Sequence, residues 1–368
     1  MREGRLSLCM IVKNEEDCIG RCLASVQGIV DEMIVVDTGS TDGTKEICAS
    51  YGARVLEFPW NGSFADARNH GLVHASGDWI LWLDADEAVD EKDGHRLRNV
   101  FKFESNPIVN IRLVNYYSKE ADDDKVLEIA HPRLLRNHIG LCFVGNIHEA
   151  LNVQDVHSEA ETDAFLDVKV YHYGYMKDVV ARKDKIKRNL DLLMHDLKDG
   201  ANLNWTHYHL ATEYARLEQF EEAYQHVNLA IMHFLQKGLM PPSLAYKLKY
   251  SILINTGSWD GAWPAIERAV ALYPDYVDLR FYMGFILLQK EMVREALDAF
   301  ERCIEIGEEN LKHLVTKGLG SFQAWYLKGI CHEKLNQQEQ AIEAYSQALK
   351  LCPNFGDARE ALDKIWGS

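Results

Sequence analysis

The sequence lacks a long hydrophobic run. No window approaches the roughly 20 consecutive apolar residues that a membrane-spanning helix needs. The opening stretch, MREGRLSLCMIVKNEE, holds only a short apolar run that charged residues soon follow, with no small-residue cleavage site after it. We therefore expect neither a transmembrane segment nor a signal peptide, and a cytoplasmic location.

The sequence also lacks an excess of positive charge. It has 40 lysines and arginines against 56 aspartates and glutamates, and its formal net charge is −16. An acidic surface repels nucleic acid and anionic lipid, so neither is expected as a main partner.

No paired cysteine framework is present. The eight cysteines are scattered, without a CxxC, and the closest pair, Cys18 and Cys22, has the spacing of one helix face. This pattern favours reduced thiols that serve as small buried hydrophobes.

Apolar runs and helical spacings alternate in the first half of the chain. Such alternation predicts βαβ units and a parallel sheet covered on both faces. Ligands of such sheets lie beyond the carboxyl ends of the strands, where Asn14, Asp37 and Asp84 are expected. A β-rich region is expected over 106–172. The expected strands are 6–12, 32–37, 53–58 and 78–84, and the expected helices are 15–29, 41–52 and 63–75.

The second half is helical and repetitive. Four segments align so that each has an alanine at one position and a small residue seven positions later. Two of these alanines, Ala262 and Ala296, lie 34 residues apart, which is the tetratricopeptide period. Longer intervals elsewhere indicate insertions, such as GEENLKHLVTKGLG. We expect a first domain over 1–175, a connecting helix over 176–204 and tetratricopeptide-like repeats over 205–368; the four aligned alanines are Ala223, Ala262, Ala296 and Ala341.

A cluster of carboxylates follows the fourth expected strand, in ILWLDADEAVD. Asp84 and Asp86 flank the small Ala85. Carboxylate oxygens suit Mg²⁺ or Mn²⁺, ions that proteins often share with substrate phosphates. The spacing alone is weak evidence for a metal site, because it also occurs by chance, and by itself it favours a capped, solvated helix start.

Three further motifs precede this pair in a fixed order. VKNEE follows the first expected strand, VVDTGSTDGT the second, and FADARNHGL lies on the helix before the acidic strand. Together with Asp-x-Asp, the set resembles family 2 glycosyltransferases of the GT-A fold over residues 5 to about 175. The helical half makes the chain similar to a bacterial subgroup that includes lipooligosaccharide glucosyltransferases and sublancin-type peptide S-glycosyltransferases.

The resemblance implies an α/β, Rossmann-like, mostly parallel GT-A domain followed by an all-α tetratricopeptide-like repeat domain. It implies an inverting transfer that depends on Mn²⁺ or Mg²⁺. The donor would be a UDP-sugar, such as UDP-glucose or a related hexose or N-acetylhexosamine. The acceptor would be a glycan, a lipid-linked saccharide or a peptide. The repeats would present the acceptor, bind a protein partner or self-associate.

The resemblance also assigns residues to roles. Asp86, with Asp84 nearby, would hold the metal, and His172 in VYHYGY would be a third ligand. Asp37 would accept from the uracil N3–H or a ribose hydroxyl, although Thr38 replaces the second aspartate of the commoner pair. The residues expected at the nucleotide sugar are Val12, Asn14, Glu15, Asp37, Arg68, Asp84 and Ala85.

An inverting transfer needs a base, and Glu149 in GNIHEAL is the residue expected in that role. It and Asp86 are the expected catalytic residues. The alternative for Glu149 is a structural glutamate bound to an arginine such as Arg133 or Arg136.

The sequence alone also allows purely structural roles for several other residues of the expected site. Arg68 can be a surface helix arginine, and His172 can belong to a cluster of tyrosines. Asn14 and Glu15 can begin a helix, and Asp42 is favoured as a helix cap.

Three other functions compete with glycosyl transfer. The chain can be a scaffold or binding protein with a vestigial sugar-nucleotide domain. A dehydrogenase is discounted, since no Gly-x-Gly-x-x-Gly follows the first strand. An Asp-x-Asp phosphatase is discounted because Lys13 and Asn14 stand where its nucleophile would be.

Overall fold

The computed structural model describes residues 4–118, 120–157, 162–174, 185–200 and 202–367. The chain forms two compact units, which divide within helix α6 (Lys185–Asp199). The first unit runs to residue 122 and includes 129–192, and the second comprises 123–128 and the chain from 193 onward. Residues 176–184 and 201 of the expected connecting helix lie outside the described residues. The domain boundaries at 175 and 204 stay predictions.

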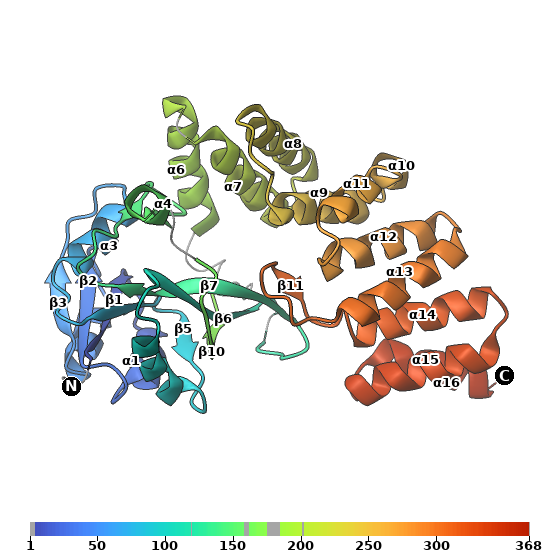
Figure 1. Cartoon of the computed structure of the whole chain (residues 1–368), viewed down its shortest axis with the longest axis horizontal. Coiled ribbons are helices and arrows are strands. Elements are labelled where there is room, and N and C mark those ends of the chain that lie inside the picture. The colour runs from blue at the N-terminus through green and yellow to red at the C-terminus, as the bar shows by residue number, and fades with distance from the viewer. Residues whose placement is uncertain (1–3, 119, 158–161, 175–184, 201, 368) are drawn as a thin grey trace. The chain divides into compact units, whose positions relative to one another are not determined.

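A mixed sheet, mostly parallel, forms the centre of the first unit (Figure 1). Four strands run parallel in the order β3-β2-β1-β4, as the alternating pattern predicts. Strand β7 then pairs antiparallel with β4, and β6, β10 and β5 complete the order. The strand bounds are β1 Leu6–Val12, β2 Glu32–Asp37, β3 Arg54–Glu57, β4 Trp79–Trp82, β5 Glu87–Val89, β6 Ile108–Tyr116, β7 Val126–Arg136 and β10 Phe165–His172.

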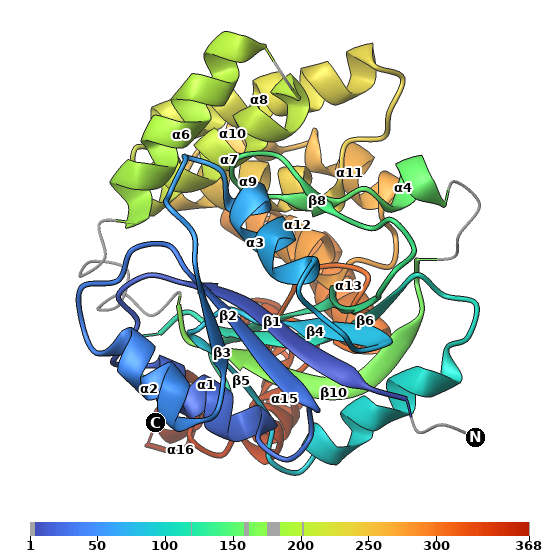
Figure 2. The same ribbon diagram turned by 90° about the vertical axis from the view of Figure 1, so that its left-hand side faces the viewer.

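Helices cover both faces of this sheet. Helix α1 (Ile19–Val26) and helix α2 (Thr44–Ser50) lie on one face, and helix α3 (Phe64–Leu72) lies on the other (Figure 2). The alternation along β1 explains this, because successive side chains of a strand point to opposite faces. Leu8 and Met10 are in the same core cluster as the apolar face of α1, whereas Cys9 packs in the cluster that contains Ala65 of α3.

The remaining elements of the first unit are short. They include a 3₁₀ helix, η1 (Gly94–Lys102), and a small hairpin of β8 (Phe143–Val144) and β9 (Ala150–Leu151), followed by α4 (Val153–Val156). Asn69 of α3 binds this hairpin. Its side-chain amide donates a hydrogen bond to the Phe143 carbonyl and accepts one from the Phe143 backbone amide. The hairpin therefore brings its neighbour Glu149 towards α3.

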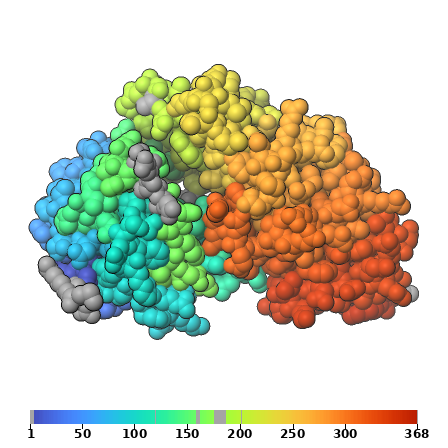
Figure 3. Space-filling view, in the orientation of Figure 1, coloured from blue at the N-terminus to red at the C-terminus, as the bar shows by residue number. Residues whose placement is uncertain are grey.

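The second unit is a stack of antiparallel helix pairs, as expected for tetratricopeptide-like repeats (Figure 1). Figure 3 shows the surface of these helices, coloured from yellow-green to red. An insertion of residues 307–321 separates α13 from α14, and its short strand β11 (Val315–Thr316) pairs with Leu127 and Glu128 at the start of β7. The helices are α7 Leu203–Arg216, α8 Phe220–Gln236, α9 Ser243–Asn255, α10 Trp259–Ala262, α11 Ile266–Leu272, α12 Val277–Gln289, α13 Val293–Ile306, α14 Phe322–Lys334, α15 Gln338–Leu351 and α16 Gly356–Gly367.

Small residues lie where the helices of a pair approach each other. The four aligned alanines are fully buried, as their spacing predicts. Gly284 and Gly329 show why no larger residue fits. A Cβ atom at Gly329 would lie 2.4 Å from the ring of Tyr345, and one at Gly284 would lie 2.8 Å from the ring of Phe300.

The structure gives the state of the cysteines and the apolar content of the helices. All eight cysteines are free thiols, and most of them are buried. In the described part of the chain, no helix is both long and apolar enough to cross a membrane.

Candidate active site

The Asp-x-Asp motif forms the turn between β4 and β5. The Asp84 carbonyl accepts a hydrogen bond from the Glu87 amide at 3.0 Å, and the Asp84 amide donates to Glu87 Oε2 at 3.0 Å. Glu87 is fully buried and forms an ion pair with Arg133 of β7. Burial raises the pKa of Glu87, and the charge of Arg133 opposes this rise. The buried ion pair of Glu87 and Arg133 thus supports the acidic turn on its interior side.

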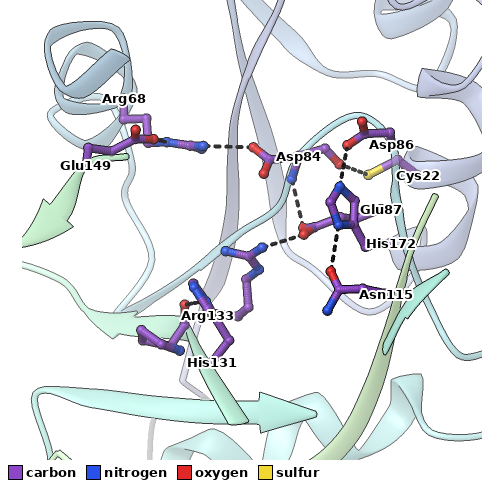
Figure 4. A network of polar contacts seen from close by, with 11 residues as sticks. Cys22, Arg68, Asp84, Asp86, Glu87, Asn115, His131, Arg133, Glu149 and His172 are labelled. Carbon is purple, nitrogen blue, oxygen red and sulfur yellow. Dashed lines mark hydrogen bonds and ion pairs between the residues drawn. The ribbon is translucent and has the colours of Figure 1, made fainter. Parts of the chain in front are cut away.

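Arg68 of α3 joins two carboxylates of the site (Figure 4). Its Nη2 atom lies 2.8 Å from Asp84 Oδ1, and its Nε atom binds Glu149. Burial disfavours the charged form of Asp84, but the guanidinium groups of Arg68 and Arg133 outweigh it and lower the pKa of Asp84. Arg68 is only 9% exposed, so the alternative of a surface arginine is wrong. The ion pair with Arg68 agrees with the alternative of an arginine-bound Glu149, with Arg68 in the place suggested for Arg133 or Arg136.

Trp82 at the end of β4 contacts both arginines of this network. The guanidinium carbons of Arg133 and Arg68 lie 3.8 Å and 4.6 Å from the Trp82 ring centroid. Because cations are attracted to indole faces, the ring supports both buried charges. Trp82 is itself buried.

Asp86 points away from Arg68 and towards His172 at the end of β10 (Figure 4). Asp86 Oδ1 lies 3.6 Å from His172 Nε2. Burial opposes the charged imidazolium, but the Asp86 carboxylate outweighs burial and raises the pKa of His172. The other ring nitrogen, Nδ1, lies 2.8 Å from Oδ1 of Asn115 on β6.

Gly174 leaves space beside this pair. A Cβ atom at Gly174 would lie 2.4 Å from Asp86 Oδ2 and 2.5 Å from His172 Nε2. The carboxylate oxygen and the imidazole nitrogen face the same small space; carboxylates suit Mg²⁺ and Mn²⁺, and imidazole is a common ligand of divalent metal ions. These two residues therefore fit a divalent ion.

Asp84 does not join them, because its carboxylate is turned to Arg68 (Figure 4). Among the described residues, no three His, Cys, Asp or Glu side chains form a group that could hold a metal. The assignment of Asp84 as a metal ligand stays a prediction.

The turns after β1 and β2 bind each other. The Asn14 amide donates to Ser40 Oγ at 2.9 Å, and Asn14 Oδ1 accepts from the Thr41 amide at 2.8 Å. The Glu15 amide donates to Thr44 Oγ1 at 2.8 Å. Asn14 has φ 54°, a conformation that asparagine tolerates better than most residues. The two motifs therefore form one structure at the edge of the sheet.

Asp42 does not take the N-cap position of α2, which Gly43 occupies, but its side chain binds the start of that helix. Its Oδ1 atom accepts from the amide of Thr44, the first residue of α2, at 3.1 Å. The bond satisfies one of the amides that have no partner within the first turn of a helix.

The other expected nucleotide residues lie at the same edge. Asp37 is buried, and its carboxylate accepts from the amides of Gly39 and Ser40 at 3.0 Å. The Val12 carbonyl accepts from the amide and hydroxyl of Thr38 at 3.0 and 3.1 Å. Thr38 thus has a structural role at the position where it departs from the commoner aspartate. Ala85 is buried between the two aspartates of the acidic turn.

Several residues of the site were not expected from the sequence. Glu87 directly follows Asp86 in the sequence, so its place in the site could have been predicted from this proximity. Asn115 and Arg133 lie in strands whose pattern indicates only burial, and Gly174 carries a signal only through its place two residues after His172.

Comparisons with known proteins agree with this architecture. Residues 7–158 match the model of glycosyl transferase family 2, and residues 322–355 match that of the tetratricopeptide repeat. A TPR repeat-containing protein of Synechococcus elongatus is 28% identical over 76% of this chain and 69% of its own length. The SPbeta prophage-derived glycosyltransferase SunS of Bacillus subtilis is 25% identical over 76% of this chain and 66% of its own length.

A glycosyltransferase of Rickettsia typhi is 37% identical, over 26% of this chain and 33% of its own length. The matches to the first two relatives thus span about two thirds of their length. Residues 7–158 therefore match the family 2 glycosyltransferases, the chain joins this domain to tetratricopeptide-like repeats, and the similarity supports glycosyltransferase activity.

Proposed function

We propose that the protein is an inverting, metal-dependent glycosyltransferase that uses a UDP-sugar. The donor sugar is glucose or a related hexose or N-acetylhexosamine, and the acceptor is a glycan, a lipid-linked saccharide or a peptide. The observation that carries the proposal is the pair Asp86 and His172, which meet beside Gly174 at the edge of a family 2 domain.

Asp86 and His172 would hold Mn²⁺ or Mg²⁺, with Asp84 in the same turn. A divalent ion in this place supplies Lewis-acid stabilisation of a departing diphosphate. The buried pair of Glu87 and Arg133 fixes the turn, so Asp86 is oriented before any ligand arrives. Such preorganisation reduces the reorganisation needed at the reacting centre.

The nucleotide would lie along the linked turns after β1 and β2. Asp37 accepts two backbone amides, and a carboxylate has further acceptor capacity for the uracil N3–H or a ribose hydroxyl. Val12, Asn14, Glu15 and Ala85 would shape the floor of this site.

Arg68 would contact the base or the diphosphate. Its Nη1 atom is buried and has no hydrogen-bond partner among the described residues, although Nε and Nη2 are occupied. A guanidinium nitrogen left in this state is suited to an anionic group of a ligand.

Glu149 would act as the base. The acceptor's nucleophilic atom would bond to the anomeric carbon on the face opposite the diphosphate as the bond to the diphosphate oxygen breaks. The acceptor's proton would pass to a carboxylate oxygen of Glu149. The ion pair with Arg68 fixes the direction of that carboxylate.

The repeat unit would present the acceptor, bind a protein partner or mediate self-association. Stacked helix pairs give extended binding surfaces, which support any of these three roles.

A panel of UDP-sugars tests this function. Wild-type protein with Mn²⁺ should release UDP from at least one donor, and Asp86→Asn should reduce the rate at least 100-fold. Asp167→Asn is the matched control, because Asp167 is 63% exposed on β10 and should leave the rate unchanged. If no donor turns over and UDP binding never depends on metal, the protein is instead a scaffold with a vestigial domain.

A further inference from the structure

Asn115 lies beside His172 in the sheet. The two residues are direct neighbours in the parallel pairing of β6 with β10. Asn115 is only 5% exposed, and its Oδ1 atom lies 2.8 Å from His172 Nδ1. The contact joins residues 57 positions apart and lies on the side of the ring opposite Asp86 (Figure 4).

The chemistry of this contact restricts the imidazole. A neutral imidazole has one nitrogen that donates and one that accepts, and an amide oxygen can only accept. A hydrogen bond between Nδ1 and Oδ1 therefore places the proton on Nδ1. The lone pair is then left on Nε2, which faces Asp86 and the space beside Gly174.

The opposite tautomer would have a strong partner as well. Asp86 Oδ1 is 3.6 Å from Nε2, and a proton on Nε2 would be drawn to that carboxylate. In that arrangement His172 Nε2 and Asp86 Oδ1 would bind each other, and neither atom would be available to a metal ion. Asn115 competes with it by offering an acceptor to Nδ1.

We propose that Asn115 is a positioning residue that holds His172 as the Nδ1–H tautomer, so that Nε2 is available to a divalent ion. The inference rests on the proposed metal-dependent function, and it assigns a role to a residue of β6 that contacts neither donor nor metal. Residues that orient a metal-binding histidine in this way commonly affect metal affinity 10–100-fold.

The tautomer can be measured without any metal. Long-range ¹H–¹⁵N correlation spectra of ¹⁵N-histidine-labelled protein, at alkaline pH, distinguish a protonated from an unprotonated ring nitrogen. His172→Gln assigns the signals. We expect Nδ1 protonated and Nε2 unprotonated in the wild-type protein. A proton on Nε2 would overturn the proposal, because Asn115 would then present its NH₂ group to the ring.

Variants of Asn115 test the consequence for binding. Asn115→Leu should shift the His172 proton towards Nε2 and weaken Mn²⁺ binding about 10–100-fold, whereas Asn115→Asp, which keeps an acceptor, should stay close to wild type. Asn110→Leu is the matched control, because Asn110 is buried on the same strand and binds the carbonyls of Thr162 and Ala164.

Asn115→Ala replaces the leucine variant if that variant does not fold. If Asn115→Leu or Asn115→Ala keeps the Nδ1–H tautomer and binds Mn²⁺ within about twofold of the Asn110→Leu control, the proposal is wrong. Failure of the wild-type protein to bind Mn²⁺ at all would contradict the proposed function. The tautomer spectra would still decide the role of Asn115.

Discussion

The guanidinium of Arg68 on α3 binds the carboxylate of Glu149, which lies 81 residues later in the chain. The same guanidinium binds Asp84, so a single side chain links the helix before β4, the acidic turn after it and the hairpin region. The proposed base and the proposed donor site are therefore coupled through one residue.

This coupling should be visible in stability. Arg68→Met should lower the free energy of unfolding by about 3 kcal/mol, because it leaves the carboxylate of Glu149 buried without its counterion. Adding Glu149→Gln should recover part of the loss. Urea denaturation of both single variants and the double variant measures the interaction energy. Strictly additive effects would mean that the pair is not energetically coupled.

Glu149→Gln should reduce transfer at least 100-fold if Glu149 takes the acceptor's proton, since glutamine cannot accept one. The affinities for UDP and Mn²⁺ should not change. Steady-state kinetics and calorimetry separate the two effects. Glu57→Gln is the control, because Glu57 is 80% exposed at β3. A loss of UDP affinity equal to the loss in rate would indicate a binding role for Glu149.

Gly174→Ala should prevent metal binding without unfolding the protein. The new Cβ atom would lie 2.4 Å from Asp86 Oδ2 and 2.5 Å from His172 Nε2, so it would occupy the space between them. Gly20→Ala on α1 is the control, since its Cβ would meet its nearest neighbour at 3.8 Å. Mn²⁺ binding is read by electron paramagnetic resonance, and circular dichroism reports the fold. Unchanged Mn²⁺ affinity in Gly174→Ala would place the ion elsewhere.

Glu32 should make the first unit sensitive to acid. Burial raises its pKa, but hydrogen bonds from Ser7 and Ser76 and the charge of Arg5 outweigh burial, and the pKa of Glu32 is lowered in the folded state. A depressed pKa adds stability above the unfolded value of about 4.3, and this stability is lost as the pH falls through the folded value.

Glu32→Gln should therefore destabilise the protein by about 1–2 kcal/mol near pH 7 and by less near pH 3. Urea denaturation at both pH values measures the difference. The exposed Glu91→Gln is the control and should change stability by less than about 0.5 kcal/mol at either pH. An equal effect of Glu32→Gln at both pH values would contradict a lowered pKa of Glu32 in the folded state.

Local patterns allowed much of the fold to be predicted. The strands over 6–12 and 32–37 end where their apolar runs end, and the recurring alanines mark the helix contacts of the repeats. One segment aligned as a repeat differs. Residues 259–270 form two short helices, α10 and α11, because Pro264 has no amide to continue the first one.

The site was predictable only in part. Asp86 and His172 were expected to meet, and they do, because Asp86 directly precedes β5, whose Glu87 pairs with His172 at the end of β10. The partners Asn115 and Arg133 depend on the register of β6 and on the antiparallel placement of β7 beside β4. No spacing in the sequence encodes either relationship, since both arise from pairing between distant strands.

The most direct test of the account is a Mn²⁺ titration, followed by electron paramagnetic resonance, with and without UDP. Wild-type protein should bind one ion per chain, more tightly when UDP is present. Asp86→Asn and His172→Gln should each weaken binding at least 10-fold, while Asp167→Asn should not. The account would be contradicted if Asp86→Asn and His172→Gln both bound Mn²⁺ as tightly as the wild-type protein does. It would also be contradicted if the wild-type protein bound no Mn²⁺ in saturating UDP.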